Sequence, residues 1–148
     1  IDLNPDIIIF GKKSQICGVM VNDKYSEAIR SPFRKLEVTF DGELIDAVRA
    51  EYILDAIEKD LLLENVIEKS KTLRAELSNM FDNYRSVGHL VAFDFSERGK
   101  RDNFVNKSYS NFLLVNPTGE KSVRLRPNLA FSDNELDELL EKITKAIK

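Results

Sequence analysis

The sequence predicts a mixed fold, with an α/β part at the start of the chain and an α+β part over the rest. Two short apolar runs flank a turn near the beginning, two long stretches with helical spacing follow, and the last third alternates strand and helix patterns. Helices on one face of a small, largely antiparallel sheet would accommodate that last part. We therefore expect the last strands of a larger sheet at residues 1–40, connecting helices at 41–81 and a small α+β domain at 82–148.

The first 40 residues contain two strand patterns. Residues 6–10 and 16–21 are apolar and rich in β-branched side chains, which predicts two short buried strands. One helical turn is expected at 24–29. Residues 30–40 contain Ser31-Pro32 and lack periodicity, so we expect a long loop, and such a loop beside a candidate site favours a functional role.

Two helix patterns occupy the middle of the chain. Apolar residues of 44–57 spread over a wide stripe, which predicts burial on more than one side, and residues 63–81 keep the helical spacing well. Residues 83–88 break that spacing. The remaining elements are expected as a strand at 90–95, a helix at 98–109 and two strands at 112–115 and 122–126, with a turn at 116–119 between the two strands. A last helix is expected after a capping box at Ser132 to Glu135.

Composition narrows the classes of function. The formal net charge of −3 and the lack of a dense basic cluster argue against a nucleic-acid partner. The apolar runs are far shorter than the ~20 residues that cross a bilayer, so no membrane partner is expected. The chain begins at Ile1, without an initiator methionine, and we expect it to be the C-terminal portion of a longer protein.

The chain holds one cysteine, Cys17, and one histidine, His89. This count excludes a Cys/His structural zinc site, and we expect no metal. A Cys–His catalytic pair stays open, but the apolar run around Cys17 favours a buried, inert thiol, and a structural hydrogen bond is the favoured role for His89. A lone cysteine is typical of a reducing compartment, so we expect a cytoplasmic protein.

Two lysines, Lys12 and Lys13, follow Gly11 where the first strand ends. A solvated turn explains most lysines in such places. The alternative is a nucleophilic amine at a strand end, where many α/β proteins bind ligands. Such an amine condenses with a carbonyl group, most often the aldehyde of pyridoxal phosphate.

The segment Pro-Asp-Ile-Ile-Ile-Phe-Gly-Lys-Lys-Ser-Gln-Ile-Cys-Gly-Val-Met at 5–20 resembles the active-site lysine segment of class III pyridoxal-phosphate aminotransferases. Within that class it is most similar to the lysine 6-aminotransferases, followed by the 4-aminobutyrate aminotransferases. The resemblance implies the C-terminal portion of a fold-type I pyridoxal-phosphate-dependent transferase. It also implies that Lys12 is the catalytic residue and binds the cofactor covalently.

Two further stretches extend the resemblance. Val38-Thr39-Phe40 is similar to the family segment whose threonine reaches the cofactor phosphate of the partner subunit, which implies a cofactor-binding role for Thr39 in a homodimer. The strand around Arg124 is similar to the family strand whose first arginine faces the substrate carboxylate. Taken without the family, Arg124 and Arg126 are typical of a charged edge strand. The implied partners are small amino acid and 2-oxo acid substrates.

Two segments depart from the family pattern. Asp41-Gly42-Glu43 stands where the family has Gly-Gly-Asn, and Arg85-Ser86-Val87-Gly88 stands where it has Arg-Gly-Arg-Gly. In the family, three further groups hold the cofactor: one binds its phosphate, one stacks on the pyridine ring and one pairs with the ring nitrogen. All of these residues lie upstream of the lysine, and none is in these 148 residues. We therefore expect the isolated chain to be inactive.

The resemblance implies transfer of the ε-amino group of L-lysine to 2-oxoglutarate by the parent protein. Two alternatives remain open. The amino donor could be 4-aminobutyrate or ornithine, or the chain could be a non-catalytic assembly or binding domain derived from this family.

Overall fold

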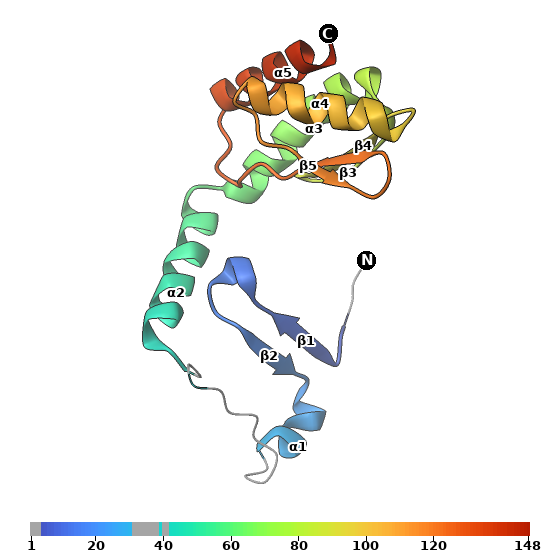
Figure 1. The fold of residues 1–148 in the computed structure, drawn as a ribbon. Coiled ribbons are helices and arrows are strands. Elements are labelled where there is room, and N and C mark those ends of the chain that lie inside the picture. Colours follow the sequence, from blue (N-terminus) through green and yellow to red (C-terminus); the bar gives the residue numbers. More distant parts are fainter. Residues whose placement is uncertain (1–3, 31–38, 40–41) are drawn as a thin grey trace. The chain divides into compact units, whose positions relative to one another are not determined.

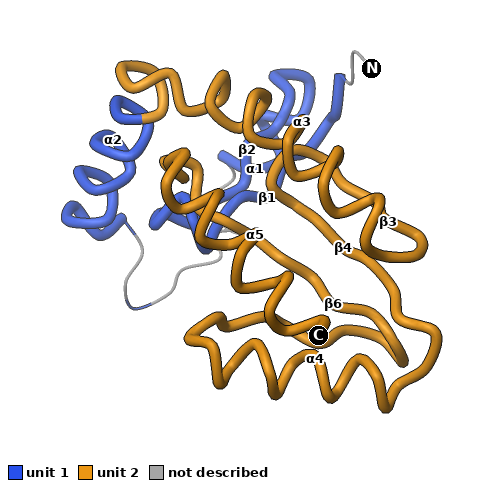
Figure 2. The backbone as a smooth tube through the Cα atoms, turned by 90° about the horizontal axis from the view of Figure 1, so that it is seen from above, with its two compact units in different colours: residues 1–56 blue, residues 57–148 orange. Residues whose placement is uncertain are grey.

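The computed structural model describes residues 4–30, 39 and 42–148. The chain divides into two compact units, residues 1–56 and residues 57–148 (Figure 2). The division falls inside a helix, and each unit is described by itself below.

The first unit begins with a β-hairpin (Figure 1). Strands β1 (Ile7–Phe10) and β2 (Gly18–Val21) pair antiparallel, with Phe10 opposite Gly18. The short 3₁₀ turn η1 (Lys12–Ser14) lies between them. The 3₁₀ turn η2 (Asp23–Tyr25), helix α1 (Ser26–Arg30) and helix α2 (Leu44–Lys59) follow. The two strands, the helical turn and this helix are therefore present where the sequence predicts them, whereas most of the predicted loop at 30–40 lies outside the described residues.

The predicted burial of these elements is wrong for the part of the chain that the structure describes. Ile9 is 81% exposed and Ile7 is 57% exposed. Only Ala50 of α2 is buried, while Leu44 and Tyr52 remain largely exposed. A two-stranded hairpin has no second layer to cover its faces, so apolar strands alone do not form a core.

The second unit contains a four-stranded antiparallel sheet in the order β3-β4-β6-β5. Its elements are α3 (Leu62–Met80), β3 (Asp82–Val87), β4 (Leu90–Asp94), α4 (Arg98–Ser110), β5 (Asn116–Thr118), β6 (Ser122–Leu125) and α5 (Asp133–Ile147). None of the helices in the described ranges combines the length and apolar character needed to cross a bilayer.

Two strand predictions in this unit are corrected. Strand β3 occupies a stretch that the sequence indicated only as a break, because its inward residues Tyr84 and Ser86 are too polar to mark a buried face. The strand expected at 112–115 lies instead at β5. Phe112 has φ = 57°, which lies outside the extended region of a regular strand. Strand β5 carries Pro117 at the edge of the sheet, where proline is tolerated.

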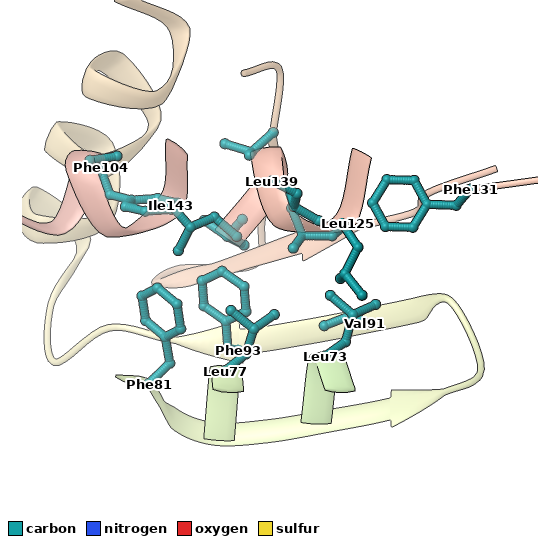
Figure 3. Close-up of a cluster of buried hydrophobic side chains, with 14 residues drawn as sticks. Leu73, Leu77, Phe81, Val91, Phe93, Phe104, Leu125, Phe131, Leu139 and Ile143 are labelled. Carbon is teal, nitrogen blue, oxygen red and sulfur yellow. The ribbon is translucent and has the colours of Figure 1, made fainter. Parts of the chain in front are cut away.

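The core lies on one face of this sheet, as the sequence predicts for an α+β domain. Val91, Phe93, Val123 and Leu125 point inward from the two central strands and are 0–6% exposed. Helices α3, α4 and α5 cover them (Figure 3), and Phe81 stacks on Phe93 with ring centroids 3.8 Å apart. The opposite face of the sheet carries polar side chains and the exposed apolar residues Val87 and Leu90, and none of the helices described in this unit packs on it.

Candidate active site

Lys12 lies two residues beyond Phe10, the last residue of β1, at the strand end where the sequence predicts it. Its φ of 61° is left-handed, which costs a non-glycine residue about 1–2 kcal/mol. Gln15 holds this conformation, because its backbone N–H and its side-chain amide both donate to the Lys12 carbonyl oxygen, at 3.0 and 3.1 Å. The side chain of Lys12 is exposed, and no ion pair joins it to any residue that the structure describes. Its neighbour Lys13 is exposed as well.

Close packing explains the two glycines of the hairpin, Gly11 and Gly18. A Cβ on Gly18 would lie 2.5 Å from the Phe10 ring, and a Cβ on Gly11 would lie 3.0 Å from Cys17 Sγ. A larger residue at either position would therefore require the Phe10 ring or the Cys17 side chain to move. Cys17 itself is exposed, so the prediction of a buried thiol is wrong.

Thr39 is an exposed turn residue. Asp41, one of the departures from the family pattern, lies outside the described residues, whereas Gly42 has φ = 70° and Glu43 is exposed. No hydrogen bond joins Thr39 to Lys12 within the part of the chain described. The phosphate-binding role of Thr39 stays a prediction.

Arg124 belongs to the second unit, on β6. It lies opposite Ala92 of β4 and Asn116 of β5, on the face that carries no helix. Its neighbours Val123 and Leu125 point into the core, so Arg124 and Arg126 both face outward and are exposed. Both arginines line an open depression of about 510 Å³ on this face.

A charged network on the same face was not foreseen from the sequence. Asp94 accepts hydrogen bonds from Ser122, Asn83 and Arg85, at 2.6, 2.9 and 3.0 Å. These bonds, the one from Ser122 most of all, lower the pKa of Asp94 from 3.8 to about 2. The sequence pattern indicates this network only weakly, because Asp94 ends an otherwise apolar strand pattern and its partners come from two other strands.

The serine in the second departure from the family pattern has a structural explanation. Ser86 faces the core side and accepts a hydrogen bond from Arg74 of α3 at 3.2 Å, so a side chain fits where the family has glycine. The retained Gly88 has φ = 54°, and a Cβ there would lie 2.8 Å from Val66. Glycine is thus kept at the position in this turn that requires it.

His89, which follows this turn, is buried, and its Nδ1 lies 2.9 Å from the Asn128 carbonyl oxygen. Because a carbonyl only accepts, Nδ1 is the donating nitrogen. The predicted structural hydrogen bond is confirmed.

Comparison with known proteins decides the family. A sequence model of the class-III aminotransferases matches residues 1–147. The chain belongs to the class-III aminotransferase family. An L-lysine-epsilon aminotransferase of Mycobacterium bovis is 33% identical over 157 residues, an alignment that covers 99% of this chain and 35% of the relative. A 4-aminobutyrate aminotransferase of Dictyostelium discoideum is 26% identical over 151 residues, covering 97% of this chain and 30% of the relative. The chain thus spans about a third of the length of the curated relatives it matches.

Solved structures of this family have the same fold. A lysine aminotransferase of M. tuberculosis in the internal aldimine form gives a TM-score of 0.87 at 33% identity, with 99% of this chain and 36% of that chain covered. An acetylornithine aminotransferase of Elizabethkingia anophelis gives 0.89 at 24% identity, with 99% and 41% covered, and at that identity it speaks for the fold alone. The predicted fold class, part of a fold-type I transferase, is confirmed.

The described residues fit the cofactor of the class-III aminotransferases in two respects. An exposed primary amine at Lys12, free of ion pairs with the residues described, suits covalent attachment of an aldehyde. An exposed hydroxyl at Thr39 suits donation to a phosphate oxygen.

Proposed function

We propose that this chain works as part of a pyridoxal-phosphate-dependent aminotransferase that moves the ε-amino group of L-lysine to 2-oxoglutarate. The observation that carries the proposal is an accessible lysine amine on a strained turn after β1, inside a family match over residues 1–147. The choice of lysine is supported by relatives named L-lysine-epsilon aminotransferase at up to 33% identity, against 26% and 30% for two 4-aminobutyrate aminotransferases.

The proposed roles follow from the chemistry of three side chains. Lys12 Nζ holds the cofactor aldehyde covalently at rest and moves a proton at the substrate carbon that bears the amino group. When bound, pyridoxal phosphate supplies an electron sink for the electron pair that this proton leaves behind. Arg124 binds a substrate carboxylate through charge-assisted hydrogen bonds, and Thr39 donates to the cofactor phosphate of the partner subunit in a homodimer.

The isolated 148-residue chain should not transaminate. It spans about a third of its curated relatives, and the groups that anchor the cofactor ring are expected from residues that it does not contain. The activity is therefore proposed for the complete gene product.

Substitution of the two adjacent lysines tests the proposal in the complete gene product. Lys12→Ala should lower the rate of transamination by at least about 10²–10⁴-fold, because it removes a positioned general base. Lys13→Ala, the matched control, should leave the rate within about twofold, since surface substitutions outside a site have small effects. Undiminished transamination by the Lys12→Ala variant would contradict the proposal, and a wild-type protein with no transaminase activity would favour the non-catalytic alternative.

A panel of amino donors separates the substrate assignments. The proposal expects L-lysine to give a higher kcat/KM than 4-aminobutyrate or ornithine, with 2-oxoglutarate as acceptor. A preference for either of the other donors would keep the family chemistry and overturn the assignment of lysine.

A further inference from the structure

The turn between β1 and β2 places two residues in the left-handed region, Lys12 and Gln15, each with φ = 61°. Residues with a Cβ rarely adopt this region, and glycine is the usual residue there. The neighbouring Gly11 has φ = 170° instead, an extended value that any residue can adopt. The turn thus imposes the unfavourable conformation on the lysine, although a glycine lies beside it.

Gln15 donates the two hydrogen bonds that favour this conformation. Its backbone nitrogen lies 3.0 Å from the Lys12 carbonyl oxygen, and its side-chain Nε2 lies 3.1 Å from the same atom. Any residue other than proline could donate the first bond, whereas the second needs a donor side chain of suitable length at position 15. The side chain of Gln15 therefore adds a specific restraint on the backbone of the lysine.

The backbone conformation of Lys12 sets the direction in which its side chain leaves the turn. The side chain is exposed, and no ion pair joins it to any residue that the structure describes. A change of φ from the left-handed to the right-handed region would rotate the Cα–Cβ bond relative to β1 and move the amine. Ser14 of the same turn donates to the Ile16 carbonyl oxygen at 2.7 Å, so its hydroxyl restrains a part of the turn that does not include Lys12.

We propose that Gln15 is a positioning residue, whose side-chain amide holds Lys12 in the left-handed conformation and so directs the Lys12 amine towards the cofactor aldehyde. The inference rests on the proposed function, because it needs Lys12 to be the amine that reacts. It adds to that function a residue that acts through the lysine backbone and whose role requires no contact with substrate or cofactor.

Reductive trapping in the complete gene product tests the inference, with Lys13 as an internal reference. The cofactor-free protein is exposed briefly to limiting pyridoxal phosphate and reduced with borohydride, and mass spectrometry gives the ratio of pyridoxyl groups on Lys12 and Lys13. Gln15→Met keeps the length of the side chain and removes its N–H donors. It should lower this ratio about fivefold, the factor expected for one lost hydrogen bond. Ser14→Ala, the matched control, should leave the ratio within about twofold.

Steady-state kinetics separate positioning from a general effect on folding. Gln15→Met should lower kcat about fivefold, change KM for L-lysine less than about twofold and leave the midpoint of thermal unfolding within a few degrees of the wild-type value. Gln15→Leu, which also lacks a donor, should reproduce the fall in kcat and in the trapping ratio.

Two results would overturn the inference and leave the proposed function intact. The wild-type protein could carry the pyridoxyl group on Lys12 with the same ratio in Gln15→Met, or Ser14→Ala could lower the ratio as much as Gln15→Met does. A wild-type protein without the group on Lys12 would instead overturn the proposed function, and this inference with it. The two failures are therefore distinguishable.

Discussion

At the scale of single residues, Asp94 fixes the position of charged and polar side chains on the face of the second unit's sheet that carries no helix. It accepts hydrogen bonds from three side chains, and one of them belongs to Arg85. With the pKa of Asp94 lowered to about 2, the carboxylate stays charged throughout the neutral range. Arg85 is thereby held in place, whereas no hydrogen bond or ion pair joins Arg124 to a side chain in the described part of the chain.

This network predicts a pH dependence of stability. A carboxylate whose pKa is lower in the folded state than in the unfolded chain stabilises the fold above pH ~4 and loses that effect as the pH falls towards about 2. Asp94→Asn should lower the free energy of unfolding at pH 7 by about 1–2 kcal/mol and flatten its decline between about pH 5 and 2. Urea unfolding across this range measures both effects. Asp137→Asn, at an exposed position of α5, is the control, and an unchanged slope in the Asp94 variant would contradict the account.

Single residues also show what the sequence could and could not predict. The place of Lys12 at a strand end and the outward direction of Arg124 follow from local pattern, since both depend only on neighbours in the chain. The exposure of Cys17 did not follow, because burial depends on what covers an apolar strand. The Asp94 network was missed because its members meet only when three strands align.

At the scale of elements, helices were predicted well and two strands poorly. Helix α5 begins at the capping box that the sequence indicates, with Ser132 Oγ accepting from the Glu135 N–H and the Glu135 carboxylate accepting from the Ser132 N–H. No comparable sequence motif marks the bounds of β3 and β5. Pairing with a central strand, rather than apolar alternation, decides where these two edge strands lie.

The capping box predicts a measurable contribution to stability. Ser132→Ala should lower the free energy of unfolding by about 1 kcal/mol, because it leaves a helical N–H without an acceptor. Chemical unfolding followed by circular dichroism measures the change. Ser78→Ala, at an exposed position of α3, removes a hydroxyl without a capping role and should leave stability equal or slightly higher. Equal stability losses in both variants would argue against the cap.

At the scale of the whole molecule, the two units differ in how much of a core they contain. Among the residues that the structure describes, every buried hydrophobic residue except Ala50 belongs to residues 57–148. In the described part of the first unit, the isoleucines of the strands are exposed to solvent. The division at residue 56 reflects the contacts within each unit, whereas the boundaries at 40 and 81 follow from the expected order of strands and helices and remain predictions.

This difference predicts that the second unit folds alone. Residues 57–148, produced as a separate polypeptide, should unfold cooperatively, because the apolar cluster on the sheet is complete within them. Differential scanning calorimetry should give a midpoint within a few degrees of the main transition of the 148-residue chain. A polypeptide that unfolds gradually, without a heat-absorption peak, would show that the core depends on the first 56 residues.

The central claim is that Lys12 carries the cofactor, and reductive trapping tests it most directly. The complete gene product is incubated with pyridoxal phosphate, reduced with borohydride and digested, and the peptides are analysed by mass spectrometry. The account predicts a pyridoxyl group on Lys12, present in the Lys13→Ala variant and absent from the Lys12→Ala variant. A folded protein that acquires the group on another lysine, or on none, would contradict it.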